Sequence, residues 1–192
     1  MSYNICCVKK IFLLEISHKN RKEISTMKRI AKFEKVSEKQ FSEGFFDSFN
    51  KTFSTEYEEI KLPIRATKGS AGYDFFSPVD FTLAPGESIK IPTGIRVRLD
   101  EGWDLKIYPR SGLGFKYRLQ LNNTVGIIDS DYYNSDNEGH IFIKITNDSK
   151  DGKIVTVKKG EGFAQGIFLE YGITEDDNVS QIRNGGFGST TK

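Results

Sequence analysis

Short segments in which apolar and polar residues alternate dominate the chain from residue 57 to residue 172. Alternation with a period of two gives a strand one buried and one exposed face, and such strands at short spacing are typical of a sandwich or barrel. The alternating segments are residues 88–92, 94–99, 104–108, 117–121, 141–145 and 153–157. Turn pairs that contain glycine lie between several of them, at residues 85–86, 101–102 and 151–152. The pattern therefore predicts an all-β fold.

One helix is predicted in the N-terminal segment, residues 27–56. Ser37 followed three residues later by Gln40 is the signature of a capping box. Phe41, Phe45 and Phe49 then repeat every four residues, which places them in one apolar stripe on a helix. We interpret the stripe as a helix packed on the core, and the alternative interpretation is an aromatic box for a ligand.

Residues 1–26 form a basic leader that differs in charge from the rest of the chain. The leader has five Lys or Arg residues and two acidic residues, a net charge of +3, so the remaining residues carry −1 of the total of +2. A near-neutral body argues against stable binding of nucleic acid through a broad basic face. Met27 offers an alternative translation start, and the leader is interpreted as disordered or as not native.

The two cysteines, Cys6 and Cys7, are adjacent and lie in the leader. Neighbouring cysteines rarely bridge each other and the sequence has no third cysteine, so no disulfide framework is possible. The apolar stretch of residues 5–16 is interrupted by charges and is too short for a membrane span. These features predict a cytoplasmic protein without a membrane segment.

Five short stretches carry residues suited to chemistry. In the first, residues 71–75, the carboxylate of Asp74 is interpreted by itself as a strand-end or turn residue. In the second, residues 109–116, Arg110 and Ser111 stand beside two glycines. That composition suits either an anion-binding concavity or a plain turn, and residue chemistry leaves both open.

The third stretch, residues 122–132, is predicted to be a hairpin with a polar tip, an apolar strand and then carboxylates and a tyrosine. Asp129 and Asp131 are spaced as a candidate metal site or are simply turn residues. In the fourth, residues 160–165, Gln165 stands in an apolar strand and needs a hydrogen-bond partner if it is buried. The fifth, residues 183–192, is a glycine-rich tail typical of a mobile segment.

Together these stretches resemble the five motifs of the homotrimeric dUTPase family, from about residue 60 to the C-terminus. The resemblance implies a jelly-roll-like β-sandwich or barrel in residues 57–177, preceded by one short N-terminal helix. It also implies that residues 178–192 form a mobile lid over the active site. The implied activity is hydrolysis of dUTP to dUMP and pyrophosphate by attack of water on the α-phosphorus.

The resemblance implies three catalytic residues. Asp129 would bond the 3′-hydroxyl of the sugar and activate the attacking water, and Gln165 would hold that water and a phosphate oxygen. Ser111 would donate to the oxygen that bridges the α and β phosphates, where charge develops on the leaving group. Asp74 would support these groups near the phosphates.

The resemblance also implies a set of substrate-binding residues. Asn123 would pair with the uracil edge, and Tyr132 would lie flat against the deoxyribose, which leaves no room for a 2′-hydroxyl. Arg110 would support the phosphates. In the tail, Arg183 would engage phosphate and Phe187 would stack on the uracil. The remaining predicted contacts are Gly112, Gly126, Gly188, Ser189 and Thr190.

Mg²⁺ is the cofactor that the resemblance implies, chelated mainly by the phosphates and water without a direct protein ligand. The implied assembly is a homotrimer whose sites are shared between subunits. Two alternatives stay open: a dCTP deaminase-like member of the same superfamily, and a nucleotide-gated regulatory binding protein.

The chain departs from the family pattern in the tail, where Arg183 lies one residue closer to Phe187 than in many relatives. It departs again in residues 133–139, a longer loop that resembles the form in Gram-positive bacteria and their phages.

Overall fold

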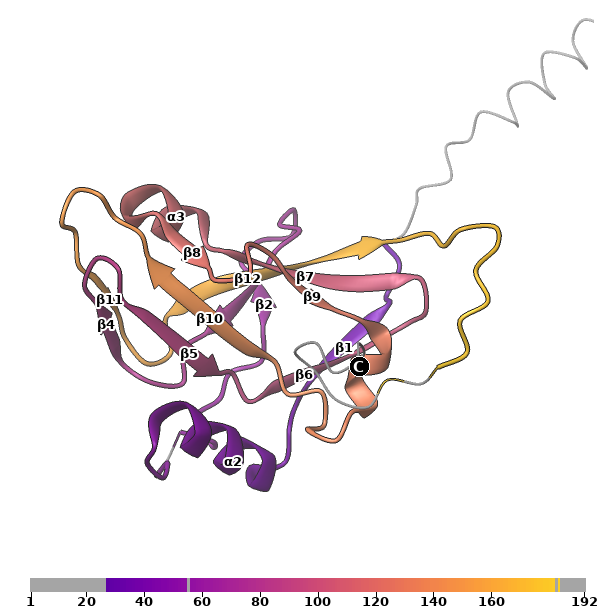
Figure 1. The fold of residues 1–192 in the computed structure, drawn as a ribbon, viewed down its shortest axis with the longest axis horizontal. Helices are drawn as coiled ribbons and strands as arrows, with labels where there is room; N and C mark the ends of the chain where they lie inside the picture. Colours follow the sequence, from indigo (N-terminus) through magenta and orange to yellow (C-terminus); the bar gives the residue numbers. More distant parts are fainter. Residues whose placement is uncertain (1–26, 55, 182, 184–192) are drawn as a thin grey trace, which may run out of the picture.

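Antiparallel β-strands make up most of the fold in the computed structural model, which describes residues 27–54, 56–181 and 183 (Figure 1). The strands are β1 (Ala31–Lys35), β2 (Ile64–Arg65), β3 (Tyr73–Phe76), β4 (Phe81–Leu83), β5 (Ser88–Pro92), β6 (Ile95–Leu99), β7 (Trp103–Pro109), β8 (Leu119–Leu121), β9 (Gly126–Ile128), β10 (Phe142–Asn147), β11 (Val155–Val157) and β12 (Gly162–Glu170). The helices are α2 (Glu38–Phe49), α3 (Ser111–Tyr117) and the 3-10 helix η1 (Ser130–Asn134). None of the described helices has the length and apolar character needed to cross a membrane. The predicted all-β class is confirmed.

β7 is an inner strand of the largest sheet, whose order is β2-β3-β12-β7-β9. It pairs with β12 along its whole length on one side. On the other side it pairs with the short β9, with Leu105 opposite Ile128 and Ile107 opposite Gly126. Because β7 lies between β9 and β12, it fixes the position of the residues that flank β9 relative to the residues of β12.

A second sheet, with the order β5-β10-β8, shares the core with the first. Phe75, Leu105 and Phe163 of the large sheet and Ile91 and Ile145 of the small one are fully buried in a single hydrophobic cluster. Two-stranded sheets, β1-β6 and β4-β11, complete the arrangement. The alternation in the sequence therefore arises because each of the two sheets packs one face on a shared core. The sheets are not closed into a barrel.

α2 begins after Ser37, whose side chain accepts a hydrogen bond from the backbone N–H of Gln40 at 3.2 Å. Phe41 and Phe45 are fully buried, and Phe49 is partly buried against the same core. This confirms the prediction of a helix packed on the core. The capping box is only half formed by local residues, because the bond to the Ser37 N–H comes from Glu138 rather than from Gln40.

Two local predictions in the region after β7 are wrong. Residues 117–121 do not form one strand, because Tyr117 ends α3 and Arg118 adopts a left-handed backbone conformation with φ of 52°. Residues 122–132 do not form a paired hairpin. The chain does reverse there, but β8 pairs with β10 and β9 pairs with β7, so the flanking strands belong to different sheets.

Replacing Phe45 with alanine should lower the free energy of unfolding by about 3–5 kcal/mol, because it leaves a cavity under α2 that the packed core cannot fill. Phe46→Ala is a matched control, since Phe46 is the next residue of the helix and is 55% exposed. The control should change the free energy by no more than about 0.5 kcal/mol. Urea unfolding of both variants at one protein concentration makes the comparison, and equal losses would contradict the assigned burial.

Candidate active site

A cavity of about 330 Å³ opens beside β9 and η1. It is lined by Asn123, Val125, Gly126, Ile127, Ile128, Asp129, Tyr132, Ile141, Phe142 and Arg183. Five of these residues were predicted from the sequence as parts of one site: Asn123, Gly126, Asp129, Tyr132 and Arg183. Apolar walls with a few polar groups at the rim are the usual character of a small-molecule site.

A tight turn carries Asn123 to the mouth of this cavity. The N–H of Thr124 donates to the carbonyl of Leu121 at 3.0 Å, and the N–H of Val125 donates to the carbonyl of Asn123 at 2.7 Å. The chain then enters β9 at Gly126, where an added Cβ would lie 3.2 Å from the Cβ of Ile107. Glycine at this position therefore lets β9 lie close against β7, which holds the turn beside the cavity.

Tyr132 forms a wall of the cavity and is only 7% exposed. Its hydroxyl donates to the carbonyl of His140 at 2.8 Å and accepts from the side-chain amide of Asn137 at 2.7 Å. Burial raises the pKa of Tyr132, against the smaller lowering effects of the Asn137 hydrogen bond and of Arg183. The phenol is therefore neutral and is held in place by two hydrogen bonds.

Asp129 lies at the cavity's edge, directly after β9. The guanidinium of Arg183 contacts the Asp129 carboxylate and also donates to Asp131 at 2.9 Å. Burial raises the pKa of Asp129. Arg183 lowers it, whereas the negative charges of Asp131 and Asp104 raise it further. A raised pKa makes this carboxylate a better proton acceptor than an ordinary exposed aspartate.

A second group of predicted residues lies at the other end of β7. The side-chain amide of Gln165 donates to the carbonyl of Pro109 at 3.1 Å. Arg110 pairs with Asp74, with 3.2 Å between Nε and Oδ1, and also donates to the carbonyl of Gly162. The Asp74 carboxylate therefore holds the guanidinium of Arg110.

Ser111 and Gly112 belong to the first turn of α3 rather than to an open loop. Arg110 is the N-cap, and its carbonyl accepts from the N–H of Gly114 at 2.9 Å. Residues 111–117 therefore form a short helix rather than the plain turn, which was one of the two interpretations of residues 109–116. Ser111 is exposed at the start of this helix, and its hydroxyl is accessible to a ligand from outside the chain.

The two groups are held apart by the length of β7. Ile128 is opposite Leu105, so Asp129 lies next to the Asp104 end of the strand, whereas Gln165 bonds Pro109. Asp104 and Pro109 are five steps apart along the extended strand, which is roughly 17 Å. Figure 1 shows α3 and η1 on opposite sides of the molecule. One chain therefore does not bring Asp129 to Ser111 and Gln165.

Asp104 and Asn137 are neighbours of the candidate site that the sequence did not indicate. Asp104 is buried and affects Asp129 across the β7–β9 ladder, and that pairing cannot be read from local alternation. His140 is a fully buried residue whose Nε2 accepts from the N–H of Gly94 at 2.9 Å. Burial lowers the pKa of His140 to about 3, so the ring is neutral.

No group of three His, Cys, Asp or Glu side chains that could hold a metal ion occurs among residues 27–54, 56–181 and 183. Asp129 and Asp131, the pair spaced as a candidate metal site, are both engaged by Arg183. The predicted tail contacts Phe187, Gly188, Ser189 and Thr190 lie outside the described residues.

Comparison with known proteins identifies relatives of this chain. A family model described as dUTPase matches residues 58–191. The deoxyuridine 5′-triphosphate nucleotidohydrolase of Lactococcus lactis is 41% identical over 141 residues, which cover 71% of this chain and 93% of that protein.

Solved structures have the same fold. The dUTPase of Streptococcus mutans is 30% identical with a TM-score of 0.55, and the match covers 74% of this chain and 98% of that one. A mutant dUTPase of Staphylococcus aureus phage phi11, described with a structural Mg(II) ion, is 22% identical with a TM-score of 0.56. That match covers 80% of this chain and 98% of the phage chain.

Two substitutions should move the pKa of Asp129 in opposite directions. Asp104→Asn removes a negative charge that disfavours ionisation, so the pKa of Asp129 should fall. Arg183→Gln removes the positive charge that favours ionisation, so the pKa should rise. NMR titration of the Asp129 carboxyl carbon measures both shifts. Asp151→Asn, which alters an exposed carboxylate paired with Lys153, is the control and should produce no shift. Shifts of the same sign in the first two variants would contradict the assigned electrostatics.

Proposed function

The chain belongs to the dUTPase family, and on that premise we propose that it hydrolyses dUTP to dUMP and pyrophosphate at a site built from both groups of residues. The observation that carries this proposal is the single cavity that joins Asn123, Gly126, Asp129, Tyr132 and Arg183. The matched region, residues 58–191, contains every residue assigned to the site. The relatives favour dUTP hydrolysis over a dCTP deaminase activity.

The cavity beside β9 is the deoxyuridine pocket in this proposal. Asn123 and neighbouring backbone groups pair with the uracil edge, and Gly126 leaves space for the base. Tyr132 packs against the deoxyribose, where its fixed ring excludes a 2′-hydroxyl. A pocket that bonds the base edge discriminates strongly against cytosine, because its buried donors and acceptors would then be unpaired.

Asp129 orients the attacking water and accepts its proton. The oxygen of that water bonds to the α-phosphorus, the bond to the bridging oxygen breaks, and pyrophosphate leaves. The raised pKa of Asp129 suits proton acceptance at neutral pH. Arg183 is paired with the Asp129 carboxylate in this structure. The guanidinium must therefore leave Asp129 and bind phosphate before Asp129 can accept a proton.

Ser111, Gln165 and Arg110 bind the phosphates, with Asp74 holding Arg110 and the backbone at Gly112 adding a donor. Ser111 donates to the leaving oxygen as its charge develops. Because β7 separates these residues from Asp129 by roughly 17 Å, a complete site needs the phosphate-binding group of another copy of the chain. We propose a homotrimer, with each site shared between subunits.

Mg²⁺ is the proposed metal, brought by the nucleotide and held mainly by phosphate oxygens and water. It supplies neutralisation of the phosphate charge when bound. Asp74, the carboxylate in the phosphate-binding group, is already paired with Arg110, which fits a metal held by the substrate rather than by the protein.

The tail residues Phe187, Gly188, Ser189 and Thr190, with Arg183, are proposed to close over bound nucleotide as a lid. We propose that the enzyme acts in the cytoplasm and does not bind nucleic acid stably.

Asp129→Asn should abolish turnover while leaving dUTP binding largely intact, because the amide keeps the shape of the side chain but accepts no proton. Pyrophosphate release from dUTP measures turnover, and calorimetric titration with a non-hydrolysable dUTP analogue measures binding. The wild type should release pyrophosphate from dUTP with Mg²⁺ and far less from dCTP, dTTP or UTP.

Near-normal turnover in the Asp129→Asn variant would remove this residue from the catalytic role. Release of ammonia from dCTP by the wild type would instead favour the deaminase alternative. Asp151→Asn is a control on charge, since it removes one exposed carboxylate far from the cavity and should leave turnover unchanged.

Co-expression of Asp129→Asn and Ser111→Ala chains with different tags should restore activity to hetero-oligomers. Each variant alone should be impaired, the serine variant by about 10²–10³. With random mixing, about a quarter of shared sites combine an intact Asp129 and an intact Ser111 from different subunits. If hetero-oligomers are no more active than the parents, Asp129 and Ser111 do not meet across a subunit boundary.

A further inference from the structure

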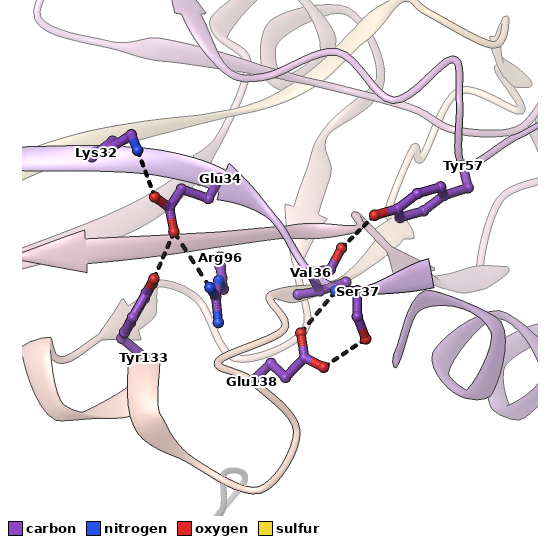
Figure 2. A network of polar contacts seen from close by, with 8 residues as sticks. All are labelled: Lys32, Glu34, Val36, Ser37, Tyr57, Arg96, Tyr133 and Glu138. Carbon is purple, nitrogen blue, oxygen red and sulfur yellow. Dashed lines mark hydrogen bonds and ion pairs between the residues drawn. The ribbon is translucent and has the colours of Figure 1, made fainter. Parts of the chain in front are cut away.

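The first turn of α2 is bonded to a loop that lies 101 residues later in the chain (Figure 2). The backbone N–H of Ser37 donates to Oε2 of Glu138 at 2.7 Å, and the Ser37 hydroxyl donates to Oε1 at 2.6 Å. The same hydroxyl accepts from the N–H of Gln40, so the cap and the long-range contact form one unit. Burial raises the pKa of Glu138, but the Ser37 bonds outweigh this and the pKa is lowered, which keeps the carboxylate charged.

Glu138 stands between the two residues that hold the phenol of Tyr132. Asn137, on one side of it, donates to the Tyr132 hydroxyl at 2.7 Å. His140, two residues after it, accepts from the same hydroxyl through its carbonyl at 2.8 Å. Tyr132 in turn lines the cavity. An anchor at Glu138 therefore acts on both hydrogen bonds that fix the ring.

The backbone at Glu138 is held in a conformation that glutamate does not favour. Its φ is +56°, and Gly139 follows with φ of +69°. An added Cβ at Gly139 would lie 2.8 Å from the carbonyl oxygen of Tyr132, so the turn is pressed against the tyrosine. Left-handed backbone is disfavoured by a side chain with a Cβ, and asparagine and glycine tolerate it best.

The N-terminal segment holds this loop at further points. The hydroxyl of Tyr133 donates to Oε2 of Glu34 in β1 at 2.6 Å, and the guanidinium of Arg96 lies 4.2 Å from the centre of the Tyr133 ring. Behind His140, an added Cβ at Gly44 of α2 would lie 2.8 Å from the imidazole. β1 therefore contacts η1 through Tyr133, and α2 contacts the loop through His140; both β1 and α2 precede the region matched by the dUTPase family model.

We propose that Glu138 is a positioning residue that ties the loop of residues 135–140 to the N-terminus of α2 and thereby fixes Tyr132 against the sugar of the nucleotide. Helix α2 is thus a specificity element of the pocket, although none of its residues lines the cavity. The inference rests on the proposed function, because it assigns Tyr132 to the deoxyribose.

The test uses the full chain with Glu138→Asn. Asparagine accepts the left-handed backbone, but its side chain is too short to reach Ser37, so the variant removes the anchor without adding strain. KM for dUTP should rise about three- to tenfold, and the preference for dUTP over UTP in kcat/KM should fall by a similar factor, because a loosened Tyr132 fits both sugars. The thermal unfolding midpoint should be unchanged or higher, and kcat should be retained.

Two further variants make the result specific. Glu138→Gln keeps an oxygen that can accept from Ser37, so it should restore KM to within about twofold of the wild type. Glu87→Asn is the matched control: it removes another carboxylate bond to a backbone N–H, that of Ala84 at 2.7 Å, in the turn between β4 and β5. The control should leave KM and sugar preference unchanged.

Unchanged KM and sugar preference in Glu138→Asn, with wild-type enzyme active on dUTP, would overturn the inference and leave the proposed function standing. A fall in thermal midpoint without a change in KM or sugar preference would overturn it as well, since it would show a structural contact only. A wild-type chain that does not hydrolyse dUTP would overturn the proposed function and this inference together.

Discussion

The antiparallel pairing of β7 with β9 on one side and β12 on the other is the constraint on which the rest of the structure depends. An extended strand cannot shorten, so residues registered to its two ends stay roughly 17 Å apart whatever else the chain does. The pairing places Asp129 at one end and Gln165 at the other. On the proposed function, catalysis at a single phosphorus requires assembly, because another copy has to bring its phosphate-binding group to the pocket. The proposed oligomer then follows from strand geometry and is not an addition to a complete site.

The sequence predicts the positions of the strands and of α2 well, but it predicts poorly which strands pair with each other. Alternation marked β5, β6, β7 and β10 within a residue or two, since each has one face on the core and one outside. The stripe of phenylalanines likewise predicted α2, because burial of Phe41 and Phe45 depends only on helical spacing. The hairpin at residues 122–132 failed for the opposite reason. A turn followed by an apolar strand looks the same whether the strands pair with each other or with β10 and β7.

The electrostatics of Asp129 show why the family motifs did not indicate Asp104. The groups that shift its pKa come from β7, from η1 and from the start of the tail, which no contiguous stretch contains. Asp104 was visible in the sequence only as a polar position in an alternating strand. Its effect depends on the register that sets Leu105 opposite Ile128 and so brings the two carboxylates to one end of β7. Register is a property of the folded sheet. Here it places Asp104 near Asp129 and so contributes to the raised pKa of Asp129.

If Glu138 positions Tyr132 as proposed, the N-terminal segment takes part in recognition although none of its residues lines the cavity. A left-handed glutamate costs about 1–2 kcal/mol relative to a relaxed backbone, and such strain persists only where the surroundings over-determine the conformation. Those surroundings include α2, whose own position is fixed by Phe41 and Phe45 in the core. Contacts therefore run from the buried phenylalanines to the helix cap, from the cap to Glu138, and from the loop of Glu138 to the phenol of Tyr132, which we propose packs against the sugar. A pocket that discriminates by excluding one hydroxyl needs a rigid wall. We propose that the burial of the α2 phenylalanines in the core contributes to the rigidity of the Tyr132 ring.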